Sequence, residues 1–193
     1  MILKSAQTSN LYRLIVISIM GTISVLLILL NFPLPFPFIP AYLRIDLSDI
    51  PALIAGVMFS PLAGVLVVAI KNLLYVIVTA ISDPIGAIAN FFAGVFYVLP
   101  VVYLFKKQQT MKNVLIGLAI GTIIMTIGMS LLNYFAIIPA YSLFMGWEEM
   151  SQNVKMSTVL VGILPFNLIK GIIVAVVFAL IFVKLQKWII EKN

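Results

Sequence analysis

Long apolar runs, separated by short polar or proline-containing stretches, follow one another along most of the chain. A helix needs about 20 apolar residues to cross the roughly 30 Å hydrocarbon core of a bilayer. The run from 50 to 81 is too long for one helix, and Pro61, preceded by Ser60, divides it into a short helix and a longer one. The pattern predicts membrane spans at about 14–34, 51–60, 62–81, 85–105, 114–139 and 158–183.

These spans predict an all-α integral membrane protein, a six-transmembrane-helix bundle that forms a single membrane domain over residues 1–193. The composition agrees, because 63% of the residues are hydrophobic and only 9% are charged, against about 25% charged residues in soluble domains. So much apolar surface excludes a soluble domain, and it is the opposite of a disordered composition. A cleaved signal peptide is the alternative for the first run, but the run is too long and no A-x-A site follows it.

The charged residues outside the spans are distributed unevenly between the two sides of such a bundle. Cytoplasmic loops carry the excess of Lys and Arg, so both termini are predicted in the cytoplasm of a multi-pass plasma-membrane protein. The net charge of +6 then reflects topology, and we reject nucleic acid as a partner. The predicted cytoplasmic side holds Lys4, Arg13, Lys106, Lys107, Lys112, Lys184, Lys187, Lys192 and one acid, Glu191, and the outer side holds Arg44, Lys155, Asp46, Asp49, Asp83, Glu148 and Glu149.

The sequence lacks the residues that several kinds of chemistry require. There is no cysteine and no histidine, which removes disulfides, zinc and haem sites and His-based catalytic triads. There is no G-x-x-x-x-G-K-[ST] phosphate-binding loop. We therefore expect a protein that is not an enzyme, binds no metal and has no cofactor of its own. A binding bundle without an energy source needs partner subunits.

Two lysines, Lys71 and Lys170, lie inside predicted spans. A charge within the membrane costs at least about 2.5–3.5 kcal/mol on insertion scales, so such residues mark functional sites by default. Because no acid falls inside any predicted span, their expected partners are carbonyls, amides, water or a ligand. The lack of intramembrane carboxylates also argues against ion pumping.

Four asparagines also fall inside the spans. Asn167 and Lys170 are three residues apart and share a helix face. With Asn90 and Asn133 they are expected in the outer half of the bundle, where they would form a pocket for a neutral, flat, partly aromatic molecule. The alternative is that the amides only join helices through hydrogen bonds, and we favour this alternative for Asn72.

The segment 31–49 carries Pro33, Pro35, Pro37 and Pro40, which exclude a helix and favour extended backbone. It is nevertheless richly apolar and includes four aromatic side chains. Such an outer loop either folds over the bundle as a lid on a ligand or lies on the lipid interface. We favour the lid.

Several sequence blocks resemble a known family. They are 30–33 (L-N-F-P), 42–51 (Y-L-R-I-D-L-S-D-I-P), 61–64 (P-L-A-G), 90–94 (N-F-F-A-G), 132–134 (L-N-Y) and 162–171 (G-I-L-P-F-N-L-I-K-G), together with 71–72 (K-N). On these blocks, the chain resembles the riboflavin-specific substrate-binding subunits (S components, RibU type) of energy-coupling factor (ECF) vitamin transporters over nearly its whole length.

The resemblance implies capture of riboflavin on the extracellular side, with riboflavin as transported substrate and FMN as a second candidate. It implies a gate formed by the first loop, and a complex with a transmembrane coupling protein and two cytoplasmic ATPase subunits. The flavin contacts that it implies are Asn133, Asn167, Lys170, Asn90, Tyr42 and Leu43. Two other functions stay open on the residues alone: a stand-alone secondary carrier or channel for a small neutral solute, and a membrane scaffold without a ligand.

Overall fold

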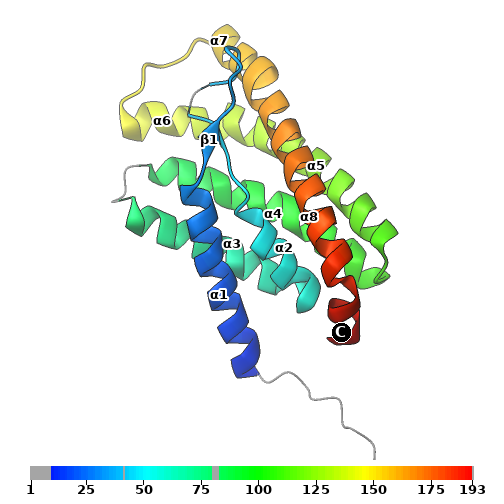
Figure 1. Ribbon diagram of the computed structural model, residues 1–193. Helices are drawn as coiled ribbons and strands as arrows, with labels where there is room; N and C mark the ends of the chain where they lie inside the picture. The colour runs from blue at the N-terminus through cyan, green and yellow to red at the C-terminus, as the bar shows by residue number, and fades with distance from the viewer. Residues whose placement is uncertain (1–9, 41, 80–82, 193) are drawn as a thin grey trace, which may run out of the picture.

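The structure, a computed structural model, describes residues 10–40, 42–79 and 83–192, with the side chains of 188 and 190–192 excepted. Its helices surround a short central helix, and one small hairpin lies at an end of the bundle (Figure 1). The elements are α1 (Asn10–Leu29), β1 (Phe32–Pro33), β2 (Arg44–Ile45), α2 (Asp49–Met58), α3 (Pro61–Val78), α4 (Pro84–Lys107), α5 (Met111–Leu132), the π-helical segment η1 (Asn133–Ile137), α6 (Ile138–Met145), α7 (Gln152–Ser157), the π-helical segment η2 (Thr158–Ile163) and α8 (Leu164–Lys192).

Among the described residues, five helices are long and apolar enough to cross a membrane. Four of them are α1, α3, α4 and the continuous stretch from α5 through α6, and the fifth runs from α7 into α8. The all-helical membrane architecture is thus confirmed. The first span ends earlier than predicted, at Leu29, because the chain turns into the hairpin. Residues 80–81, the predicted end of the third span, lie outside the described residues, as does Lys4.

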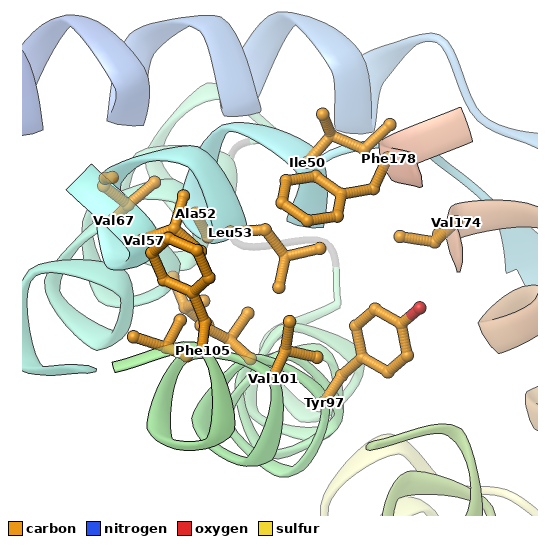
Figure 2. Close-up of a cluster of buried hydrophobic side chains, with 14 of the residues drawn as sticks. Ile50, Ala52, Leu53, Val57, Val67, Tyr97, Val101, Phe105, Val174 and Phe178 are labelled. Carbon is orange, nitrogen blue, oxygen red and sulfur yellow. The ribbon is translucent and has the colours of Figure 1, made fainter. Parts of the chain in front are cut away.

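The short helix α2 is the centre of the bundle. Nine of its ten residues are buried, and it contacts α1, α3, α4 and α8. Figure 2 shows Leu53 of α2 among Val101, Phe105 and Phe178, which come from α4 and α8. At about 1.5 Å per residue, a ten-residue helix spans only half of the hydrocarbon core. The sixth membrane crossing therefore stays a prediction.

The break between α2 and α3 is where the sequence predicts it. Ser60 adopts an extended backbone, and its hydroxyl accepts a hydrogen bond from the backbone N–H of Ala63 at 3.2 Å. Pro61 begins α3, a position at which its missing N–H costs nothing. At the start of α2, by contrast, Ser48 occupies the cap position but makes no side-chain cap bond, because its hydroxyl is used elsewhere.

Two prolines shape the longest helices. Pro139 and Pro165 each lie two residues beyond a π-helical segment, η1 and η2 respectively. Proline removes the hydrogen bond to the residue four before it and crowds that carbonyl, and a π turn is one way in which a helix accommodates the disturbance. The helix therefore continues past Pro139 to Met145, beyond the predicted end of the fifth span at 139. The two π segments contact each other.

The proline-rich segment forms a two-stranded antiparallel hairpin in which Phe32 pairs with Ile45 and Pro33 with Arg44. Ile39 and Ile45 are buried against Phe166 of α8. Phe36 and Phe38 stack on each other with their ring centroids 5.5 Å apart and stay exposed. The predicted absence of a helix here is confirmed, and the segment both packs on the bundle and exposes aromatic rings. In Figure 1 it lies at the end of the bundle opposite to the start of α1 and the end of α8.

Candidate ligand-binding site

One cavity gathers all six side chains that the sequence analysis selected: Tyr42, Leu43, Asn90, Asn133, Asn167 and Lys170. They come from the hairpin segment, α4, η1 and α8, which lie far apart in the sequence. The volume of the cavity is about 130 Å³, whereas sites for drug-sized ligands typically measure about 300–1,000 Å³. A flavin, which has three fused rings, would therefore require the cavity to widen. The segment with Tyr42 and Leu43 forms one wall of the cavity.

The amide side chains of the cavity are partly satisfied by their own helices. The Nδ2 groups of Asn133 and Asn167 donate to the backbone carbonyls of Met129 and Ile163, each at 2.8 Å. Because the amide nitrogen carries two N–H groups, each side chain keeps one N–H and its oxygen for another partner. Asn90 is different, because its Oδ1 is buried without a hydrogen-bond partner among the described residues. A buried acceptor of this kind costs about 1–3 kcal/mol unless something donates to it.

Asn72 is the asparagine that we assigned to helix joining. Its Nδ2 donates to the carbonyl of Val68 at 2.8 Å, within its own helix α3. It is not among the residues that line the cavity in the described part of the chain. This bond stays within one helix, so the assignment of Asn72 to helix joining stays a prediction.

The two intramembrane lysines are paired with aspartates. Lys170 Nζ lies 2.9 Å from Asp46 Oδ2, and Lys71 Nζ lies 2.7 Å from Asp49 Oδ1. All four side chains are buried, with 4% exposure or less. The expectation that the lysines pair with carbonyls, amides, water or a ligand is wrong, because the folded chain brings acids from just outside the predicted spans into the bundle.

The two ion pairs belong to one network that Ser48 connects. Its hydroxyl donates to Asp46 Oδ1 and accepts from Lys71 Nζ at 2.8 Å. The backbone N–H of Ser48 also donates to Asp46 Oδ1, at 2.9 Å. On the other side, Asp49 Oδ2 lies 4.0 Å from Lys170 Nζ, which closes the ring. This arrangement explains why Ser48 does not cap α2.

The network is charge-balanced and has one face on the cavity. Lys170 and Asp46 line the cavity, whereas Lys71, Ser48 and Asp49 lie behind them. Burial alone would raise the pKa of Asp46, but the ammonium groups of Lys170 and Lys71 and the hydrogen bond from Ser48 outweigh it and hold that pKa well below its usual range. Asp46 is therefore an anion in the folded protein.

A close approach of α4 completes the packing around the network. A Cβ atom added to Gly94 would lie 3.0 Å from Asp49 Oδ1 and 2.8 Å from Val68 Cγ1. Any residue other than glycine would therefore have to displace the carboxylate or the valine. The N-F-F-A-G block thus supplies both Asn90 to the cavity and a contact to the buried acid.

Three aromatic side chains meet at the edge of the cavity. Tyr141 and Trp147 stack with their ring centroids 4.3 Å apart, and the ring of Tyr42 lies 5.2 Å from that of Trp147. The Tyr141 hydroxyl donates to Asp83 Oδ1 at 2.8 Å, and the same oxygen accepts from the backbone N–H of Gly86 at the start of α4. These contacts between aromatic rings join the hairpin segment to α6.

Sequence reasoning missed Asp46, Asp83 and Tyr141, which all line the cavity. The first two were treated only as charges of the outer side. A signal for Asp46 was present, because two lysines inside spans require nearby anions and the 42–51 block brings two aspartates next to a predicted span. For Tyr141 no comparable signal exists.

The chain matches the family model described as the ECF transporter, substrate-specific component, over residues 12–182. It is 49% identical to the riboflavin transporter FmnP of Bacillus subtilis over 183 residues, which are 94% of this chain and 95% of the relative. It is 40% identical to the riboflavin transporter RibU of Staphylococcus aureus, with 92% of each chain covered.

A solved structure, described as that of the S component of a bacterial ECF transporter, has the same fold. The TM-score is 0.78 at 37% sequence identity, and the match covers 93% of this chain and 98% of the other.

Proposed function

The chain belongs to the family of ECF transporter substrate-specific components, and from this premise we propose that it captures riboflavin and hands it to an ATP-driven import complex. Members of this family are transporter components and not enzymes. Riboflavin is then the transported substrate and not a cofactor. FMN, the phosphate ester of riboflavin, is a second candidate substrate.

The observation that carries the proposal is the convergence of polar and aromatic side chains on one cavity. The flavin ring is flat and carries an imide and carbonyl groups, which amides can both donate to and accept from. Asn90, Asn133 and Asn167 supply such amides, and Lys170 adds a donor. Their identification as ligand contacts is part of the proposal, as is the role of Tyr42 and Leu43 in covering the ring.

The orientation is proposed on the distribution of charge. The basic residues of the α4–α5 turn and those near the C-terminal end of α8 lie at the same end as the start of α1 (Figure 1). If this end is cytoplasmic, as the excess of Lys and Arg indicates, the cavity opens towards the outside. The hairpin segment would then act as the lid, and α2 would be the sixth, short crossing. The partners would be a transmembrane coupling protein and two cytoplasmic ATPase subunits.

The test is a titration of riboflavin into the purified protein in detergent. We expect flavin fluorescence to be quenched with 1:1 stoichiometry and the protein to co-purify with a yellow chromophore. Lumichrome, which keeps the ring system but lacks the ribityl chain, separates the contribution of the ring from that of the hydroxyl groups. No quenching at micromolar concentrations would refute the proposal and favour a scaffold without a ligand.

A further inference from the structure

Asp46 occupies a position that the flavin-binding role does not by itself explain. Its carboxylate lines the cavity, yet it contacts the ammonium of Lys170 instead of pointing into open space. We propose that Asp46 determines the charge preference of the cavity: by pairing with Lys170 it makes the site select uncharged flavins over anionic ones. This inference rests on the proposed binding of flavins at this cavity.

The charges of the buried network balance one another. The buried network contains two lysines and two aspartates, so its charges sum to zero. Asp49 already pairs with Lys71 through its Oδ1 at 2.7 Å, and its single negative charge cannot neutralise both Lys71 and Lys170. Without Asp46, the network would carry one uncompensated positive charge next to the ligand.

Lys170 still has hydrogen-bond donors for a ligand. An ammonium has three N–H donors, and Asp46 is the hydrogen-bond acceptor that the described residues provide to it. The other donors can therefore reach a ligand carbonyl while the charge is already neutralised. Lys170 thus serves as a directional donor and not as a receptor for an anion.

An anionic ligand loses binding free energy in a charge-balanced, buried site. A buried anion loses its hydration and needs an unpaired cation in return. Among the other charged groups of the cavity wall, Asp83 is an acid. The guanidinium of Arg44 donates to Asn31 Oδ1 at 3.0 Å and is exposed, so solvent screens its charge. A neutral flavin pays no such desolvation cost.

The experiment compares two flavins of nearly equal size that differ in charge, 10-(2-hydroxyethyl)flavin and 10-(carboxymethyl)flavin, by fluorescence titration at pH 7. For the unmodified protein we expect the neutral compound to bind at least tenfold more tightly. In Asp46→Asn, the ratio of the two dissociation constants should shift towards the anion by on the order of tenfold or more, as expected for a unit charge within several ångströms in a partly buried site.

The matched control is Glu148→Gln, which removes the same charge from an exposed residue outside the cavity. Its ratio should equal that of the unmodified protein, because exposed charges are screened. In Asp46→Asn/Lys170→Met the network is neutral again, so the ratio should return towards the original value even though both affinities fall.

The outcomes separate the two hypotheses. Tighter or equal binding of the carboxylate by the unmodified protein overturns this inference, and that measurement needs no variant to fold. Riboflavin binding to Asp46→Asn with an unchanged ratio overturns it as well. Failure of the unmodified protein to bind riboflavin overturns the proposed function, and this inference falls with it.

Discussion

Lys71 is the side chain whose removal probes the buried ion pairs without touching the ligand wall. Its Nζ contacts Asp49 and Ser48 at 2.7 and 2.8 Å, and the side chain is fully buried. It is not among the described residues that line the cavity. In Lys71→Met the carboxylate of Asp49 loses its nearest cation, whereas the volume of the substituted side chain changes little.

The expected loss follows from the burial of that carboxylate. Breaking a buried ion pair by removal of one partner costs about 3–5 kcal/mol, because the remaining charge stays uncompensated. For a domain of about 150–250 residues, 1 kcal/mol corresponds to roughly 2–4 °C in Tm. We therefore expect Lys71→Met to lower Tm by roughly 6–20 °C.

The assay is thermal unfolding in detergent, followed by circular dichroism, without added flavin. Lys184→Met is the control, because Lys184 is exposed and such substitutions stay within about 0.5 kcal/mol. In Lys71→Met/Asp49→Leu both charges are removed, so much of the lost stability should return. A Tm for Lys71→Met within about 2 °C of the unmodified protein would refute the ion-pair reasoning.

Two further variants probe the cavity and its cover. Asn167→Leu should weaken riboflavin binding by about 1–3 kcal/mol, since a polar group of the ligand would be left unpaired; an unchanged dissociation constant in a fluorescence titration would assign Asn167 to structure alone. Tyr42→Ala should speed riboflavin release more than it slows capture in stopped-flow measurements, because most contact losses act on dissociation; a change confined to association would favour an interfacial loop over a lid.

Two interruptions of the helices were predictable from local sequence, whereas several helix ends were not. The break at Ser60–Pro61 and the non-helical character of the proline-rich segment depend on backbone chemistry that neighbouring residues determine. The π turn that precedes Pro139 was not predictable in this way, because it forms where two helices contact each other.

The candidate site was predictable in membership but not in its electrostatics. The free-energy cost of placing polar side chains in a membrane identifies Lys170 and the asparagines as candidates without any knowledge of the fold. The pairing of Lys170 with Asp46, 124 residues away in sequence, requires the hairpin to pack on α8 and carry the acid inwards. The ring contacts between Tyr42 and Trp147 are likewise tertiary, since no periodicity relates a loop to a helix end.

One consequence of that pairing changes how Lys170 variants should behave. Lys170→Met removes the counterion of a buried acid as well as a proposed ligand contact. We therefore expect a loss of thermal stability together with the loss of binding, unlike for Asn167→Leu.

We infer that this chain captures its substrate but depends on ATP-driven partners to import it. It contains no phosphate-binding loop, and its buried charges are paired within one network. The most direct measurement is riboflavin uptake into liposomes that contain the purified chain, with and without the coupling protein, the ATPase subunits and ATP. The account predicts binding without accumulation for the chain alone, and accumulation when all partners and ATP are present. Accumulation above equilibrium by the chain alone, driven by an ion gradient, would contradict it and identify a secondary carrier.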